Sequence, residues 1–199
     1  MENDLHVKNT IEIELVSTDR QVEEILQLQQ RNLPAALSEK EMKDQGFVTV
    51  QHAPEVLKEM NRIAPSVIAT HLQHIVGYAL VMPADFRNSV PILEPMFSLI
   101  EKLTYENLPL SSYNYFIMGQ VCIEKSYRGK GLFDQLYNGL RRNLSNRYDL
   151  MITEVASRNQ RSLNAHLRAG LKVIHQYSDP WGEQWELMLW DWRISKQEA

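Results

Sequence analysis

Two glycines and three cations lie close together in the stretch EKSYRGKGLF, which spans residues 124–133. The apolar run YFIMGQVCI, with the composition of a strand, precedes it, and an apolar pattern with helical spacing follows it. Glycines at a strand-to-helix junction allow a tight turn that points several backbone amides at one place. The positive end of the helix dipole adds to these amides, and Lys125, Arg128 and Lys130 add charge. The stretch therefore predicts an anion site, and a diphosphate fits it.

The spacing excludes two common nucleotide-binding motifs. A P-loop requires GxxxxGK[ST], but Gly131 follows Gly129-Lys130, and Glu124 stands where the first glycine belongs. The dinucleotide fingerprint GxGxxG fails because Asp134 occupies the place of its third glycine. The sequence thus disfavours ATP and NAD. A simple glycine turn with solvated lysines is the alternative interpretation.

The elements that must position this stretch follow from the hydrophobic pattern. Alternating or continuous apolar runs predict strands at 11–16, 66–70, 74–82, 114–123, 149–155, 171–177 and 184–192. Apolar residues at helical spacing predict helices at 18–29, 54–63, 132–144 and 158–170. The order β-α-α-β-β-(83–113)-β-α-β-α-β-β predicts an α/β fold of the α+β type, with a mixed sheet and helices on its faces.

Local signals predict several boundaries. Thr18 and Gln21 have the spacing of a capping box at the start of the first helix. Pro54 opens the second helix, in which one face carries Val56, Leu57, Met60 and Ile63. Residues 38–46 form a polar, solvated stretch, and residues 83–113 are interpreted as an insertion that contains a short amphipathic helix.

The length and composition predict one domain that comprises residues 1–199. Hydrophobic residues make up 44% and charged residues 23%, a normal balance for a folded chain. The net charge of −4 gives no reason to expect nucleic acid as a partner. The one cysteine, Cys122, excludes an intramolecular disulfide and a cysteine-based metal cluster, and no histidine spacing backed by carboxylates favours a metal.

A membrane partner is also not expected. Residues 64–84 lack acidic and basic residues, but His71, Gln73 and His74 lie at the centre of this run, where a bilayer would disfavour them. Two strands joined by a turn at Leu72-Gln73 explain the run better. Because no apolar signal-peptide stretch is visible at the N-terminus, a cytoplasmic location is expected.

Two motifs in the second half of the chain resemble the GCN5-related N-acetyltransferases. The pyrophosphate loop of that family has the form [Q/R]xxGx[G/A], which Arg128 and Gly131 match, while Phe133 stands at the last position. The family also tends to carry NxxAxxLYxxxGF after the next strand, which here reads Asn159, Ser162, Ala165, His166, Gly170 and Leu171. His166 stands in the place of the usual tyrosine. The resemblance covers residues 67–192 well and the N-terminal part in the order of its elements.

The resemblance implies a GNAT-like fold, in which a central, mostly antiparallel sheet is flanked by helices and its middle strands splay apart. It implies acetyl-CoA as the donor and co-substrate, with no metal. Backbone groups near Val121 and Ile123 would bind the pantetheine and polarise the thioester carbonyl. The pyrophosphate would be held by Arg128, Gly129, Lys130, Gly131, Leu132 and Phe133. Asn159 and Ser162 of the second motif complete the expected cofactor-binding set.

Acetyl transfer to an amine also needs a base, because an alkylamine is almost entirely protonated at pH 7. Glu124 and Gln120 lie on or just after the central strand, but strand alternation does not say which face either takes. Glu124 is a catalytic candidate, with a solvated carboxylate at a strand end as the alternative. His166 is the candidate acid that protonates the departing CoA thiolate, with a packed structural histidine as the alternative.

These patterns lead to one main hypothesis and two alternatives. The main one is an N-acetyltransferase that transfers acetyl directly from acetyl-CoA to a small-molecule or peptide amine. A CoA-binding regulatory or interaction module without turnover is the first alternative, and a purely structural domain with an empty loop is the second. The late tryptophans, Trp181, Trp185, Trp190 and Trp192, favour core packing or a homodimer interface.

Overall fold

The predicted order of strands and helices is found in the structure, a computed structural model that describes residues 10–33, 36 and 50–193. The strands are β1 (Glu12–Leu15), β2 (Val67–His71), β3 (His74–Pro83), β4 (Thr104–Tyr105), β5 (Leu108–Pro109), β6 (Tyr115–Ile123), β7 (Leu150–Ala156), β8 (Lys172–Ser178) and β9 (Gln184–Asp191). The α-helices are α1 (Asp19–Gln30), α3 (Pro54–Ile63), α4 (Glu94–Ile100), α5 (Leu132–Leu144) and α6 (Gln160–Arg168). Short 3-10 helices are η2 (Ala84–Ser89), η3 (Pro91–Leu93), η4 (Leu110–Ser112) and η5 (Lys125–Tyr127). The polar stretch 38–46 lies outside the described residues.

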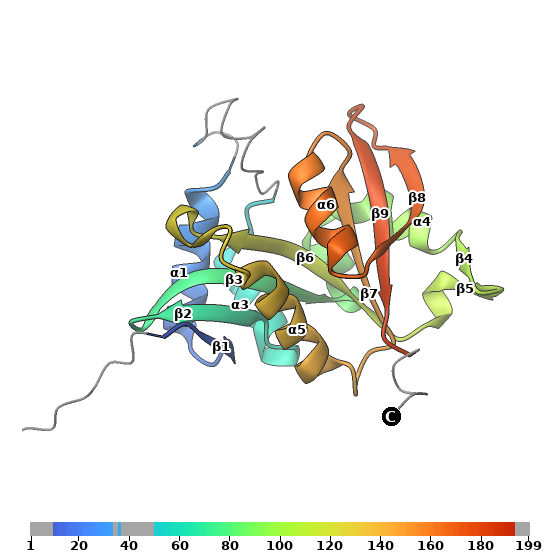
Figure 1. Ribbon diagram of the computed structural model, residues 1–199. Helices are drawn as coiled ribbons and strands as arrows, with labels where there is room; N and C mark the ends of the chain where they lie inside the picture. The colour runs from blue at the N-terminus through green and yellow to red at the C-terminus, as the bar shows by residue number, and fades with distance from the viewer. Residues whose placement is uncertain (1–9, 34–35, 37–49, 194–199) are drawn as a thin grey trace, which may run out of the picture.

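Seven strands form one sheet in the order β1-β2-β3-β6-β7-β9-β8 (Figure 1). Neighbouring strands of this sheet run antiparallel except β6 and β7, which run parallel. Helices α1 and α3 cover one face, and α5 and α6 cover the other (Figure 1). This confirms the predicted mixed, mostly antiparallel sheet flanked by helices.

Two local predictions near the N-terminus are confirmed. The Thr18 hydroxyl accepts a hydrogen bond from the Gln21 amide, and the Gln21 side chain accepts one from the Thr18 amide, so the capping box is complete. Leu72 and Gln73 both have positive φ angles, 50° and 65°, which is the geometry of a tight hairpin turn between β2 and β3. Residues 64–84 thus form a buried hairpin. Among the described residues, no helix has the length and apolarity to span a bilayer.

Helix α3 buries Leu57 and Met60 as predicted, but its buried face differs near its end. Ile63, predicted to be buried, is 38% exposed, whereas Asn61 is 7% exposed. The Asn61 side chain donates to the Leu57 carbonyl and accepts from the Ser66 amide, both at 2.8 Å. Because these bonds satisfy the amide, it takes a core position and links the helix to the start of β2.

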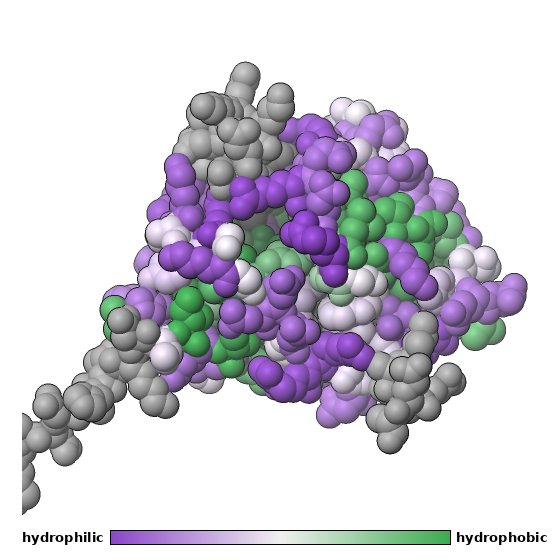
Figure 2. All heavy atoms as spheres, viewed as in Figure 1, coloured by the Kyte–Doolittle hydropathy of each residue, from purple (hydrophilic) through white to green (hydrophobic). Residues whose placement is uncertain are grey.

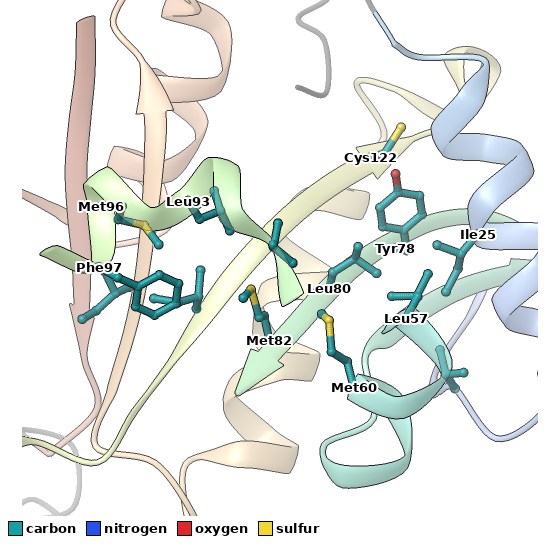
Figure 3. Packing of buried hydrophobic residues seen from close by; sticks show 14 of the residues in the cluster. Ile25, Leu57, Met60, Tyr78, Leu80, Met82, Leu93, Met96, Phe97 and Cys122 are labelled. Carbon is teal, nitrogen blue, oxygen red and sulfur yellow. The ribbon is translucent and has the colours of Figure 1, made fainter. Parts of the chain in front are cut away.

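The hydrophobic core has two parts, one on each face of the sheet. Figure 3 shows part of the first, where Ile25, Leu57 and Met60 of α1 and α3 pack toward Tyr78, Leu80 and Met82 of β3. The segment between β3 and β6 supplies the other end of this cluster through Leu93, Met96 and Phe97 (Figure 3). This segment contains the predicted short helix, α4, and a β4–β5 hairpin that the sequence did not indicate.

The second part of the core lies between the sheet and helix α5. It contains Leu136 and Leu140 of the helix, Met151 and Met188 of the sheet, and Trp192. Trp192 is completely buried and packs near Phe116, whose ring centroid lies 5.6 Å away, whereas Trp181 is 69% exposed in the β8–β9 connection. Of the two predicted alternatives, Trp192 therefore takes core packing.

Gly139 of α5 is where this helix approaches the sheet most closely. A Cβ atom at this position would lie 2.8 Å from Val67 Cγ1 and 2.9 Å from Ile13 Cγ2. Alanine in place of glycine inside a helix normally stabilises by about 1 kcal/mol. Here the overlap outweighs that gain, so Gly139→Ala is expected to lower the free energy of unfolding by about 1–3 kcal/mol in urea titrations. Asn138→Ala, on the exposed side of the same helix, is the control, and a Gly139→Ala protein as stable as the parent would contradict the packing described.

Candidate active site

The middle strands β6 and β7 separate after three residue pairs. They are paired at Tyr115/Leu150, Phe116/Met151 and Ile117/Ile152, although both strands continue well beyond this point. At the start of the opening, the Thr153 hydroxyl donates to the Met118 carbonyl at 2.9 Å. The register of β6 against β3 shifts at the same level, from Val81/Met118 to Leu80/Gln120, so Gly119 is the extra residue of a bulge. The predicted splaying of the middle strands is thus present.

The opened edge of β6 exposes backbone groups toward the gap. The Glu124 amide donates to Val76 of β3 at 2.8 Å, and neighbouring residues of a strand point their backbone groups to opposite sides. The backbone groups of Ile123 and Val121 therefore point away from β3 and toward the gap. The Ile123 carbonyl accepts a hydrogen bond from Arg128 Nε at 2.8 Å. The cofactor-binding role of both residues stays a prediction, and their backbone orientation is compatible with it.

The glycine loop begins at the end of this edge. Gly129 and Gly131 have φ angles of +74° and +76°, which side-chain-bearing residues rarely adopt, and Gly131 is the N-cap of α5. Among the described residues, no side chain caps this helix, so its first backbone amides remain available to a ligand. Arg128 braces the loop, because its Nη2 donates to Asn32 Oδ1 at 2.6 Å while its Nε holds Ile123. The loop therefore has the geometry of an anion cradle.

A cavity of about 500 Å³ joins the edge of β6, the glycine loop and helix α6. Figure 2 shows a hollow between this loop and α6, with apolar residues at its floor and polar ones around its rim. Its lining comprises Asn32, Val121, Cys122, Ile123, Arg128, Gly129, Gly131, Leu132, Phe133, Asp134, Arg161, Ser162, Asn164, Ala165 and Arg168. Three arginines, from the loop and α6, give it a cationic rim. The contributions of Arg161, Asn164 and Arg168 were not anticipated, because their spacing on α6 follows no motif.

Three of the predicted loop residues direct their side chains at other residues of the protein. The Lys130 ammonium lies 5.2 Å from the centre of the Tyr127 ring, and Lys130 is not among the residues that line the cavity. The Leu132 side chain is 2% exposed and belongs to the core, so only its backbone faces the cavity. Phe133 stacks on Tyr137 with ring centroids 4.2 Å apart. The aromatic side chain at the end of the loop motif thus packs on α5.

A second, narrow cavity of about 60 Å³ lies in the gap between β6 and β7. It is lined by Met118, Gly119, Gln120, Val121, Thr153, Glu154, Val155, Ala156, Asn159, Ser162, His166 and Trp185. Neighbouring strand residues such as Glu154 and Val155 point to opposite faces of the sheet, so this cavity passes between the faces. Asn159 and Ser162 lie at its α6 side, where Asn159 Oδ1 accepts the Ser162 amide and caps the helix.

The His166 ring is engaged within the core. Nε2 lies 2.6 Å from the Tyr137 hydroxyl, and Nδ1 lies 2.7 Å from the Ser162 carbonyl. A carbonyl accepts only, so Nδ1 carries the proton and Nε2 accepts from Tyr137. Burial lowers the pKa of His166 to about 4. The ring is therefore neutral at pH 7, and this geometry does not favour the acid role, which stays a prediction.

Gln120 and Glu124 lie on the face of β6 that α1 covers. Gln120 Oε1 accepts from Tyr78 at 2.6 Å and from Gln29 at 2.8 Å, and its amide donates to the Val50 carbonyl. Glu124 forms an ion pair with Arg31 at 3.0 Å and caps η5 through the Lys125 amide. Gln120 thus anchors the chain at Val50. The base role of Glu124 stays a prediction, and its partners favour a structural role.

One carboxylate in the narrow cavity was missed by the sequence reasoning. Glu154 of β7 accepts a hydrogen bond from the Tyr177 hydroxyl of β8. Burial raises the pKa of Glu154 to about 7, against the hydrogen bond from Tyr177, which lowers it. The signal was available, because Glu154 is the single charged residue in the otherwise apolar run LMITEVA.

The sequence matches no protein-family model and no curated protein sequence. The fold does match solved structures. An acetyltransferase of the GNAT family from Streptococcus pneumoniae is 11% identical with a TM-score of 0.57, over 92% of this chain and 99% of that chain. The ribosomal-protein-S18-alanine N-acetyltransferase from Escherichia coli is 13% identical with a TM-score of 0.56, over 92% and 94%. A chain of the NatC complex bound to Gag peptide and CoA is 14% identical with a TM-score of 0.60, over 91% and 98%.

These matches cover nearly all of both chains. At such identities the likeness concerns the arrangement of the backbone. The chain has the fold of the GCN5-related N-acetyltransferases.

Proposed function

We propose that this protein is an N-acetyltransferase that transfers acetyl directly from acetyl-CoA to an amine. The observation that carries the proposal is the continuous cavity that joins the glycine loop to the opened edge of β6. A diphosphate on the loop amides and an extended pantetheine along β6 fit the shape and chemistry of this cavity. One matched structure, the NatC complex, is described as bound to CoA, which supports the same ligand here.

In this proposal each part of the cavity has one task. The amides of Gly131, Leu132 and Phe133 hold the pyrophosphate, and Gly129 permits the turn before them. Arg128 positions the loop by bracing it against Ile123 and Asn32. Backbone groups of Val121 and Ile123 bind the pantetheine as a neighbouring strand would. Ser162 and Asn159 close the α6 side of the gap, and Lys130 contributes charge from the surface.

Direct transfer is favoured over a covalent acyl-enzyme. Cys122, the one cysteine, is 6% exposed, and burial raises its pKa to about 12. A thiol that remains protonated is a poor nucleophile. The amine nitrogen would instead attack the thioester carbon itself, and the C–S bond breaks as the amide forms. The amine loses a proton to a base, and the departing thiolate takes one up.

The acceptor is proposed to be a small-molecule or peptide amine. Two matched structures point to this class, since one is an N-acetyltransferase of an alanine in a ribosomal protein and the other is bound to a peptide. Helix α1 and the segment 83–113 lie on the face of the sheet that is free of α5 and α6, and we expect the acceptor to meet that face.

Release of free thiol from acetyl-CoA in the presence of a panel of primary amines and peptides tests the proposal. The expected result is thiol release that depends on an amine, with the acetylated product identified by its mass. Saturable binding of acetyl-CoA without thiol release from any amine would favour the CoA-binding module instead, an alternative that the engaged ring of His166 supports. If acetyl-CoA does not bind at all, the remaining alternative is a purely structural domain with an empty loop. Light scattering on the same sample tests the proposed homodimer.

A further inference from the structure

Glu154 lines the gap between β6 and β7, two residues beyond Ile152, where the pairing of the two strands ends. It is paired with Leu187 of β9, and it shares a sheet face with Ile152, which belongs to the core cluster on the α1 side. The acetyl group of a donor that follows the edge of β6 would reach this part of the gap, near Gly119. Glu154 is the one carboxylate among the described residues that line the narrow cavity. Glu154 thus lies close to the expected position of the acetyl group and on the face of the sheet where we expect the acceptor.

The two carboxylate oxygens of Glu154 have different surroundings. Oε2 accepts the hydrogen bond from the Tyr177 hydroxyl. Among the residues that the structure describes, the hydrogen bond of Tyr177 to Oε2 is the one that this carboxylate accepts. Tyr177 thus fixes the orientation of the carboxylate and leaves one oxygen for a donor that is not part of this chain. An ammonium group is such a donor.

Among the residues that the structure describes, Glu154 forms no ion pair with a lysine or an arginine. Tyr177 and His175 lie on β8, Asp179 lies in the β8–β9 connection, and the neutral amide of Gln120 faces it across the gap. Asp179 is anionic and raises the pKa of Glu154 further, in the same direction as burial. The pKa of about 7 is close to the optimum for a general base at neutral pH.

The other candidate bases are placed less well. Glu124 lies five residues beyond Gly119, which is roughly 16 Å along an extended strand. It is also paired with Arg31, whose charge competes for its lone pairs. His52 is buried, and its Nδ1 accepts from the Gln29 amide. None of these groups lines the narrow cavity.

We propose that Glu154 is the catalytic base, whose Oε1 takes a proton from the ammonium of a primary alkylamine before the neutral nitrogen attacks the thioester carbon. The C–S bond then breaks, and the second proton that the nitrogen loses as the amide forms goes to the departing thiolate. Tyr177 is the positioning residue that holds Oε2. This inference rests on the proposed function. It predicts that the acceptor arrives as a cation, because a carboxylate with a vacant oxygen binds an ammonium and the reaction needs its proton removed. After the amide has left, Glu154 returns the proton to solvent.

Two probe amines separate proton removal from all other steps. Ethylamine is protonated at pH 7, whereas 2,2,2-trifluoroethylamine is largely neutral and needs little help from a base. Glu154→Gln is expected to lower kcat for ethylamine by about 100-fold or more, a usual loss for a general base. Its effect on trifluoroethylamine should stay within a few-fold. Glu55→Gln, an exposed carboxylate on α3, is the matched control and should leave both rates unchanged.

The pH profile provides a second readout that a structural role would not produce. The rate with ethylamine should rise with pH in the parent and level off above about 7, where Glu154 is ionised. In Glu154→Gln the rate should be low at pH 7 and keep rising with the neutral fraction of ethylamine, with no change of slope near pH 7. Because the hydrogen bond from Tyr177 lowers the pKa of Glu154, Tyr177→Phe should move the rise to higher pH with the rate plateau largely retained.

A thermal-shift titration with acetyl-CoA distinguishes failure of this inference from failure of the proposed function. Glu154→Gln should bind acetyl-CoA like the parent, because it lies away from the loop. If this variant turns over ethylamine at the parental rate, Glu154 is not the base, although the acetyltransferase proposal stands. If the parent binds acetyl-CoA and releases no thiol with either amine or with any member of the panel of amines and peptides, both proposals are overturned.

Discussion

Gly131→Asp is expected to abolish the stabilisation that acetyl-CoA gives to the parent. A ligand at about 100 times its Kd adds roughly 2.7 kcal/mol, and about 2–4 °C per kcal/mol is usual for a chain of this size. A saturating donor should therefore raise Tm of the parent by about 5–10 °C. An aspartate at the helix N-cap places a carboxylate against the pyrophosphate, where like charges repel strongly. The expected affinity loss is about 100-fold, measured by thermal shift and by isothermal titration.

Any substitution at Gly131 strains the backbone, so the control must be a glycine with a similar φ angle. With φ at +76°, a residue that bears a side chain costs about 1 kcal/mol, whatever its charge. Gly182, in the β8–β9 connection, has φ at +90° and, like Gly131, nothing within 4 Å of a built Cβ. Gly182→Asp should lose similar stability and keep the full response to acetyl-CoA. A folded Gly131→Asp protein that still responds would remove the loop from the proposed binding site.

The stability of the protein should depend on pH through two buried histidines. Burial lowers the pKa of both His52 and His166 to about 4, below the value of 6.5 for an unfolded chain. The stabilising contribution of each is therefore present above pH 6.5 and is lost as the pH falls toward 4, because the unfolded chain takes up the proton first. Between pH 7 and pH 5 each should remove about 2 kcal/mol from the free energy of unfolding.

Glu154 acts in the opposite direction. Its folded pKa of about 7 lies above the unfolded value of 4.5, so its contribution favours the folded state below pH 4.5 and is lost as the pH rises through 7. Between pH 7 and pH 5, protonation of Glu154 therefore raises the free energy of unfolding by about 2 kcal/mol. Together the three groups thus lower the free energy of unfolding by about 2 kcal/mol, because the loss of about 4 kcal/mol from the two histidines exceeds the gain of about 2 kcal/mol from Glu154.

Urea unfolding at pH 7 and pH 5 separates the three groups. Glu154→Gln should double the loss between the two pH values to about 4 kcal/mol, and His166→Gln should nearly abolish it. The comparison uses differences between pH values, so the hydrogen bonds that each substitution removes at both pH values cancel. A His166→Gln protein with the pH dependence of the parent would mean that His166 is already charged in the folded state.

The parts of the fold that depend on neighbouring residues were predictable from the sequence. The Thr18 capping box, the Leu72-Gln73 turn and the glycine loop each involve a few consecutive residues, and their backbone preferences need no partner from elsewhere. The order of strands and helices followed in the same way from periodicity.

The chemistry of the gap was harder to predict, because it depends on where two strands stop pairing. Alternation says that Gln120 and Glu124 share a face, but the hydrogen bonds of Gln120 to Gln29 and Tyr78 come from residues distant in the chain. His166 was expected from its motif position, yet its ring is buried because Tyr137, on another helix, is hydrogen-bonded to its Nε2. Burial and the charge of Asp179 raise the pKa of Glu154 against the hydrogen bond from Tyr177, and strand LMITEVA reveals none of these causes.

The short pairing between β6 and β7 also has a mechanical consequence. It divides the sheet into two leaves, β1-β2-β3-β6 and β7-β9-β8, that share a seam of three residue pairs. Within each leaf the strands are hydrogen-bonded along most of their length. Bending of the sheet is therefore easiest at the seam. The width of the gap is therefore governed by the stiffness of that seam. Phe116 and Met151 form one of the three pairs of this seam and line neither cavity. Substitutions at these two residues should therefore change the width of the gap without touching a bound ligand.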